Sequence, residues 1–136
     1  MDGLYSVIVT IHNIFGGLTL LLTLVAAVML FVTARTTAQG SALVLRADLI
    51  SASIQATLGI LLIILGLIMG NGAYIGGLWL HYIFGIAAVG VVSAMAARAR
   101  RAPDSEARRY GGILLGVLLL VLVTFMIGQF KYNPLV

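Results

Sequence analysis

Two histidines are the side chains of this sequence best suited to chemistry, and both stand in the same five-residue string. His12 opens HNIFG and His81 opens HYIFG, each inside a long apolar stretch. An ionisable side chain within a membrane span is a candidate functional residue, because its polar nitrogens are costly to leave unpaired in hydrocarbon. A neutral imidazole can bond one nitrogen to a nearby carbonyl and offer the other to a metal. The repeated string therefore indicates an internal repeat in which each half supplies one imidazole.

A pair of imidazoles is the axial ligand set of a six-coordinate b-type haem, and four-helix bundles build such sites from side chains on facing helices. We therefore predict that His12 and His81 bind the iron of a haem b. Gly16 and Gly85 follow the histidines by four residues, which places each glycine one turn away on the same helix face, where it leaves room for a porphyrin edge. Lys131 is the one cation expected at that end of the bundle, as a propionate partner or a snorkelling anchor.

The elements that position these residues follow from the composition, which is 62% hydrophobic and 9% charged over 136 residues. A soluble domain of this size carries far more polar surface. Four apolar stretches each reach the ~20 residues that cross a bilayer core of ~30 Å, and their backbone must be helical to pair its polar groups in lipid. We expect an all-α, integral membrane four-helix bundle of up-down-up-down topology that forms one domain over residues 1–136. The predicted spans cover about residues 4–34, 49–69, 73–97 and 110–130.

The basic residues predict the orientation of the spans. Seven of the eight Lys and Arg residues lie in the first and third connections, and positively charged connections stay on the cytoplasmic side. Both termini are then non-cytoplasmic, and we expect a multi-pass protein of a prokaryotic inner membrane. The pI near 10 therefore indicates contact with a membrane surface and its lipids, with no nucleic acid as partner. The sequence has no cysteine, which excludes disulfides, covalent c-type haem attachment and cysteine nucleophiles.

The first and third spans run in the same direction, so a two-plus-two parallel repeat gives a pseudo-two-fold axis along the membrane normal. Such an axis brings His12 and His81 to similar depth, facing each other across the bundle centre. The depths do not match perfectly, because His12 precedes Arg35 by 23 residues and His81 precedes Arg98 by 17, a difference of about 9 Å of helix rise. The second and fourth spans share only the string GILL.

The four-span plan and the paired H-x-x-x-G strings resemble small transmembrane b-type cytochromes and the haem-bearing membrane anchor subunits of respiratory complexes. The resemblance implies axial-ligand roles for His12 and His81. It implies an electron-transfer subunit, rather than an independent enzyme, with one bis-histidine haem near the non-cytoplasmic face. Such a subunit would belong to a larger respiratory or photosynthetic complex and would bind partner subunits in the membrane.

Other interpretations of the histidines remain open. A histidine in a span is often a hydrogen-bonding residue between helices, and the pair could also form a quinone or proton site. It would make a poor zinc or copper site, because the predicted spans contain no Asp, Glu or Cys. Polar side chains near the cytoplasmic end of the second span suggest interhelical hydrogen bonds or a quinone headgroup contact: Ser51, Ser53 and Gln55.

Two alternative functions follow from these readings. The first is a cofactor-free accessory subunit that packs against a larger membrane complex, and the second is a small channel or carrier with the histidines lining its pore. We place Asp48 at the boundary of the second span, as a possible N-cap. With no carboxylate inside the spans, the sequence argues against a proton-coupled pump or transporter.

Overall fold

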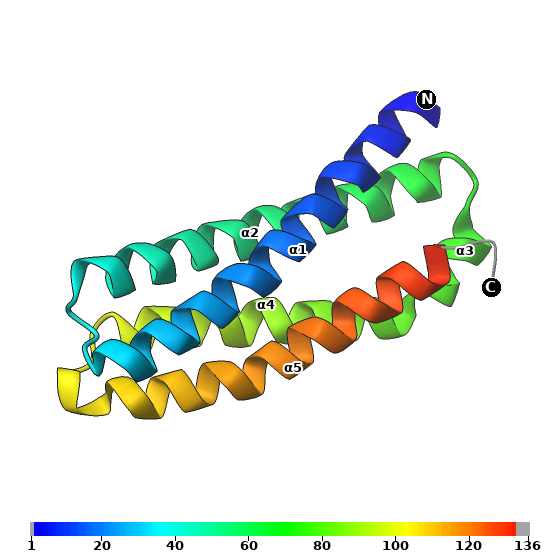
Figure 1. The fold of residues 1–136 in the computed structure, drawn as a ribbon. Helices are drawn as coiled ribbons and strands as arrows, with labels where there is room; N and C mark the ends of the chain where they lie inside the picture. Colours follow the sequence, from blue (N-terminus) through cyan, green and yellow to red (C-terminus); the bar gives the residue numbers. More distant parts are fainter. Residues whose placement is uncertain (1, 133–136) are drawn as a thin grey trace.

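The computed structural model describes residues 2–132, with side chains over residues 3–130, and contains four long helices (Figure 1). They are α1 (Asp2–Thr33), α2 (Gln39–Ile68), α4 (Trp79–Ala99) and α5 (Ala107–Tyr132). A short helix α3 (Gly72–Gly77) and a 3₁₀ turn η1 (Asp104–Glu106) lie in two of the connections. The described residues form no strand, so the predicted all-α bundle is confirmed.

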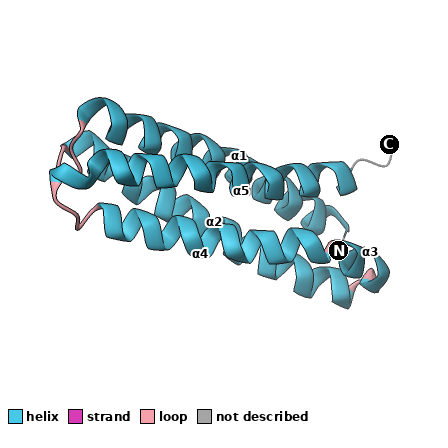
Figure 2. Cartoon of the chain, turned by 90° about the horizontal axis from the view of Figure 1, so that it is seen from below, coloured by secondary structure: helices cyan, strands magenta, loops and turns pink. Residues whose placement is uncertain are grey.

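The four long helices form an up-down-up-down bundle. Helix α1 packs on α2 and α5, and α4 packs on the same two helices, so α1 and α4 lie on a diagonal and run in the same direction. The α1–α2 and α4–α5 connections gather at one end of the bundle, whereas α3 and the N-terminus lie at the other end (Figures 1 and 2). This diagonal arrangement points the inner faces of α1 and α4 at each other.

The outer surface of the bundle is apolar, as contact with lipid requires. Each of the four long helices is long and apolar enough to cross a membrane. Large aliphatic side chains are exposed on all of them, for example Ile14, Ile64, Ile86 and Leu119. A water-soluble protein rarely exposes apolar surface this extensive. The predicted four-span membrane protein is therefore supported by the distribution of side chains as well as by composition.

Small residues close the bundle at the end that carries the two charged connections. A β-carbon added at Gly111 of α5 would come within 3.0 Å of the Ala27 carbonyl oxygen of α1. Membrane helices approach this closely where small residues face one another. The buried core at this end is mostly alanine and leucine: Ala26, Ala27, Leu30, Leu45, Ala96, Ala99, Ala107 and Leu114. The helices therefore pack tightly at this end of the bundle.

The prediction for the start of the second span was wrong. Helix α2 begins at Gln39, ten residues before the predicted boundary at residue 49. Asp48 is not an N-cap but lies inside the helix, with no exposed surface. The helix can continue through these residues because Arg46 is exposed on its outer side and Asp48 accepts hydrogen bonds from Thr23 of α1. The expectation that the spans contain no carboxylate was therefore also wrong.

The third predicted span is divided in two. Helix α3 ends after Gly76 and Gly77, two residues that weaken a helix, and α4 begins after Leu78. The turn before α3 passes through Gly70, whose φ of 78° is in the left-handed region that favours glycine. The break lets α3 lie across the open end of the bundle, where Ile75 is buried.

Candidate functional site

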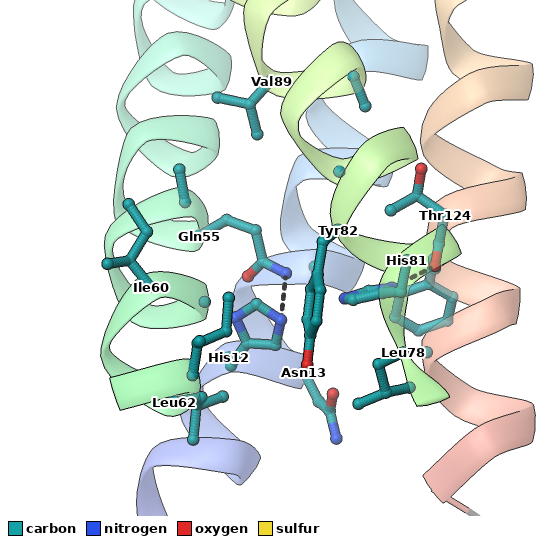
Figure 3. A pocket seen from close by; sticks show the side chains of 18 of the residues that line it. His12, Asn13, Gln55, Ile60, Leu62, Leu78, His81, Tyr82, Val89 and Thr124 are labelled. Carbon is teal, nitrogen blue, oxygen red and sulfur yellow. Dashed lines mark hydrogen bonds between the residues drawn. The ribbon is translucent and has the colours of Figure 1, made fainter. Parts of the chain in front are cut away.

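The two histidines lie together in the interior of the bundle. His12 of α1 and His81 of α4 face each other across the diagonal, with ring centroids 6.1 Å apart and ring planes at 72° (Figure 3). The two rings therefore lie close in depth, although their spacing from the arginines in the sequence suggested a difference. Both rings line one cavity of about 230 Å³ in the half of the bundle away from the charged connections.

All four long helices and α3 contribute to the wall of this cavity. Most of the lining side chains are apolar, including Ile63, Ile86, Val89 and Phe125. A limited set of polar side chains lines the same space: Tyr5, His12, Asn13, Thr19, Gln55, Tyr74, His81, Tyr82, Thr124 and Gln129. Apolar walls with a few convergent polar groups are typical of ligand and cofactor sites. Three of these polar residues are tyrosines: Tyr5, Tyr74 and Tyr82.

The ring of His81 is held by a backbone group. Its Nδ1 lies 2.9 Å from the carbonyl oxygen of Thr124 on α5. A carbonyl oxygen only accepts hydrogen bonds, so Nδ1 carries the ring hydrogen and Nε2 keeps its lone pair. Histidines that bind metals are oriented in this way by a carbonyl on the second nitrogen. In Figure 3 the free edge of the ring points toward the middle of the cavity.

The ring of His12 is held by a side chain instead. Its Nε2 lies 3.2 Å from Nε2 of Gln55 on α2, so the amide donates to the imidazole lone pair. His12 Nδ1 and Gln55 Oε1 are both buried and have no hydrogen-bond partner. Turning the amide over would exchange the roles of its oxygen and nitrogen but would still leave one amide atom unpaired. Buried polar atoms without partners are rare in proteins, so the His12–Gln55 pair carries hydrogen-bonding capacity that no described residue uses.

The glycines that follow the histidines by four residues both line the cavity. A β-carbon at Gly16 would lie 3.2 Å from both Gln55 Nε2 and the Phe125 ring, so side chains of α2 and α5 pack closely in front of it. At Gly85 the nearest atom would be Thr124 Cγ2 at 3.7 Å, an ordinary contact. The predicted role of the two glycines beside a porphyrin edge stays a prediction.

The glycines that touch the imidazoles lie on the neighbouring helices. A β-carbon at Gly59 of α2 would lie 3.3 Å from Cε1 of His12, and one at Gly128 of α5 would lie 2.9 Å from Cε1 of His81. Each histidine thus fits against a helix surface that only glycine leaves open. Gly128 was not among the predicted site residues, although it follows Gly59 by 69 residues, as His81 follows His12.

The geometry extends the internal repeat to the second helix of each half. His12 and its partner Gln55 are 43 residues apart, as are His81 and its partner Thr124. The 69-residue step from His12 to His81 also relates Gly59 to Gly128, and it relates the cavity residues Tyr5 and Tyr74. The GILL strings are not equivalent, because Gly112 lies near Phe31 and not near a histidine. Helices α1 and α2 are therefore repeated by α3–α4 and α5.

The remaining predicted residues are distributed as follows. Ser53 points away from the site and is exposed, donating to the carbonyl oxygen of Leu49. Ser51 is buried against α1 rather than in the cavity. Lys131 belongs to α5, but its side chain lies outside the described residues, so its predicted pairing stays a prediction.

No family model, curated protein or solved structure matches this chain. Within residues 2–132, no group of three His, Cys, Asp or Glu side chains is placed to hold a metal ion. An ion bound by protein side chains alone usually needs three or four such ligands. Two imidazoles instead suit a metal that brings its remaining ligands with it, as a metalloporphyrin does.

The spacing of the histidines agrees with that donor set. A metal–imidazole bond of about 2.0 Å on each side places the centres of two axial rings about 6 Å apart, and the observed distance is 6.1 Å. The cavity of about 230 Å³ is somewhat smaller than the ~300–1,000 Å³ of common ligand pockets. Gln55 would have to turn away from His12 to free both the nitrogen and the space. The donor set and the ring spacing therefore fit the group, whereas the cavity would have to widen to hold a macrocycle.

Proposed function

We propose that the protein is a membrane-embedded electron-transfer subunit that holds one haem b between His12 and His81. The observation that carries this proposal is the 6.1 Å separation of two imidazoles from diagonal helices inside one cavity. A haem with two axial histidines transfers single electrons and leaves no iron position open for oxygen. The redox chemistry belongs to the cofactor.

The chain's own residues would bind and orient this group. Thr124 holds the His81 ring so that Nε2 faces the cavity, and Gly128 lets the ring lie against α5. Gln55 contacts His12 Nε2 and would have to turn away before that nitrogen could bind the iron. The apolar walls would exclude water from the macrocycle, and the exclusion of water affects the reduction potential.

The position of the cavity supports electron transfer near one membrane face. The cavity lies toward the end of the bundle opposite the arginine-rich connections. By the positive-inside rule, we propose that this end is the non-cytoplasmic side of a prokaryotic inner membrane. The described residues lie almost entirely in the helical bundle, and we propose that the protein works with partner subunits of a respiratory or photosynthetic complex, or exchanges electrons with a quinol.

An optical spectrum of the purified protein tests the proposal. We expect a reduced-minus-oxidised difference spectrum with the α-band of a b-type haem. The band should be lost or shifted to a five-coordinate form in His12→Ala and in His81→Ala. A suitable control is Ile14→Ala, because Ile14 is close to His12 on α1 but faces outward. Protein that stays colourless after expression with ample haem would contradict the proposal.

A cofactor-free accessory subunit is the second candidate. The observation that favours it is that each histidine already bonds to a neighbouring helix, through Gln55 or Thr124. Such polar contacts stabilise the packing of neighbouring membrane helices, and each contact contributes about 0.6 kcal/mol. In that case the alanine variants would lower thermal stability without changing any spectrum, because the unmodified protein would have no visible absorption.

A further inference from the structure

A second polar cluster lies between α1 and α2, on the side of the cavity that faces the charged connections. Thr23 of α1 lies 3.0 and 3.2 Å from the two carboxylate oxygens of Asp48 on α2. Nearer the cavity, Thr19 Oγ1 lies 2.8 Å from Ser51 Oγ. All four side chains are buried, and Asp48 has no exposed surface. We call these four residues the α1–α2 polar cluster.

The hydrogen count at Thr23 favours a protonated partner. Thr23 Oγ1 lies 2.9 Å from the carbonyl oxygen of Thr19 and 3.0 Å from Asp48 Oδ1. A hydroxyl has one hydrogen, and neither a carbonyl nor a carboxylate can supply a second. Both contacts become full hydrogen bonds when Asp48 is protonated, donates to Thr23, and leaves the Thr23 hydrogen for the carbonyl of Thr19. The geometry therefore accommodates a carboxyl that gains and loses a proton.

No charged group compensates an ionised Asp48. Within the described residues the one ion pair is Arg109–Glu106. On α2 itself Arg46 is exposed, and the titratable groups on the helices around Asp48 make no bond to it. These groups are Tyr5 and His12 on α1, His81, Tyr82 and Arg98 on α4, Arg100 just after the end of α4, and Arg108, Arg109 and Tyr110 on α5. An unpaired ionised carboxylate inside a membrane is costly, and such residues usually mark proton or ion sites.

The internal repeat shows that the bundle does not need this polar cluster for packing. The 69-residue step converts Thr19, Thr23, Asp48 and Ser51 into apolar residues of the other half: Ala88, Val92, Val117 and Leu120. Ala88, Val92 and Val117 belong to a buried hydrophobic cluster, and Leu120 packs against that cluster. Equivalent positions in the same fold are thus filled by hydrocarbon. The polar cluster is confined to one half and needs an explanation other than helix packing.

The cluster leads from Asp48 to the histidine cavity. Thr19 lines the cavity. Ser51 lies one helical turn from Gln55, which contacts His12. Along α2, seven residues separate Asp48 from Gln55, about 10 Å of helix rise. A charge that forms in the cavity would therefore be felt at Asp48 through a largely apolar interior, where electrostatic interactions are strong.

We propose that Asp48 is a proton-binding site coupled to the electron-transfer site, so that it takes up a proton when the cavity gains an electron and releases it on oxidation. This inference rests on the proposed function. The electron comes from the redox donor that the proposed function requires, and the proton comes from water. The carboxylate becomes a neutral carboxyl, so the added electron is balanced by the added proton. By linkage, protonation of Asp48 must in turn favour the reduced form.

Infrared difference spectroscopy tests the proposal on the holoprotein, with a redox titration at several pH values. The chain has only four acidic side chains, so carboxyl bands are few. Reduction should produce the C=O band of a protonated carboxyl that is lost in Asp48→Asn and kept in the control Asp104→Asn. The midpoint potential should fall by up to about 59 mV for each tenfold drop in proton concentration, and the slope should flatten in Asp48→Asn.

A second variant keeps the test decisive if Asp48→Asn does not fold. Thr23→Val introduces the residue that the repeat itself has at the equivalent position, Val92, and it leaves Asp48 in place. The carboxyl band should then persist at a higher frequency, because the group has lost its hydrogen-bond partner. A coloured protein with no such band, or with equal slopes in Asp48→Asn and the unmodified protein, would overturn the coupling alone. A colourless protein would overturn the proposed function and the coupling with it.

Discussion

His12 and His81 differ in the group that holds the second ring nitrogen. His81 is bonded to a backbone carbonyl of α5, which cannot turn over, so its tautomer and direction are fixed. His12 is bonded to the amide of Gln55, a side chain that can rotate. At the residue scale, therefore, His81 is preset as a ligand, whereas His12 must exchange one partner for another. Gly59 and Gly128 leave the space in which the rings of His12 and His81 lie.

Gly128→Ala tests the importance of that glycine. The new β-carbon would lie 2.9 Å from His81 Cε1, so the ring must move. We expect a loss of about 1–3 kcal/mol of unfolding free energy from overpacking, together with weaker haem binding. The control is Gly116→Ala on the same helix, where no atom lies within 4 Å and the change in helix propensity should stabilise by up to about 1 kcal/mol. Equal thermal unfolding and equal haem retention in the two variants would contradict this account.

At the scale of elements, one loop contact ties the two charged connections together. Asp104 in η1 accepts hydrogen bonds from the backbone N–H groups of Thr36 and Thr37, at 2.8 and 3.0 Å, and from both hydroxyls. The Thr36 hydroxyl also lies 2.6 Å from the carbonyl oxygen of Ala102, so its one hydrogen is shared between Asp104 and this carbonyl. The start of α2 is thereby fixed against the start of α5, although these segments are far apart in the sequence. The contact holds the closed end of the bundle, from which the helices extend to the cavity.

Asp104→Ala should therefore lower the thermal unfolding temperature of the detergent-purified protein, because several backbone and hydroxyl donors lose their acceptor. The matched control is Glu106→Ala two residues later, whose one ion pair with Arg109 is long at 3.6 Å and solvent-exposed. We expect no measurable change in that control. If the two variants melt at the same temperature, the contact does not hold the connections together.

At the scale of the whole molecule, sequence patterns accounted for the four spans and for the meeting of the two histidines. Hydropathy identifies spans well because lipid demands long apolar helices. Hydropathy failed at Asp48, because a carboxyl group in the sequence indicates the end of a span unless a partner for it is known. The partner of Asp48 is Thr23, which lies 25 residues earlier in the sequence. Hydropathy also gives no indication of Gly128, because the side chain that requires a glycine there, His81, belongs to another helix. The 69-residue step would have revealed this glycine if it had been extended beyond the histidine strings.

The orientation in the membrane is a further prediction at this scale. The chain has no cysteine, so single cysteines can be introduced for labelling without a background. We expect Asn71→Cys, in the exposed turn between α2 and α3, to react with a membrane-impermeant maleimide added to intact cells. We expect Ser105→Cys, in the exposed connection before α5, to react only after the membrane is opened. The reverse labelling pattern would show that the charged connections face outward.

The most direct measurement of the central claim is electron paramagnetic resonance of the oxidised, purified protein. Two imidazoles on one iron make it six-coordinate, and the account predicts a low-spin ferric signal that disappears in both His12→Ala and His81→Ala. Ring planes far from parallel, as the 72° angle indicates, should give a strongly anisotropic signal. A high-spin signal in the unmodified protein that stays unchanged in one of the two variants would show that a single histidine binds the iron, and it would contradict the claim that the pair shares it.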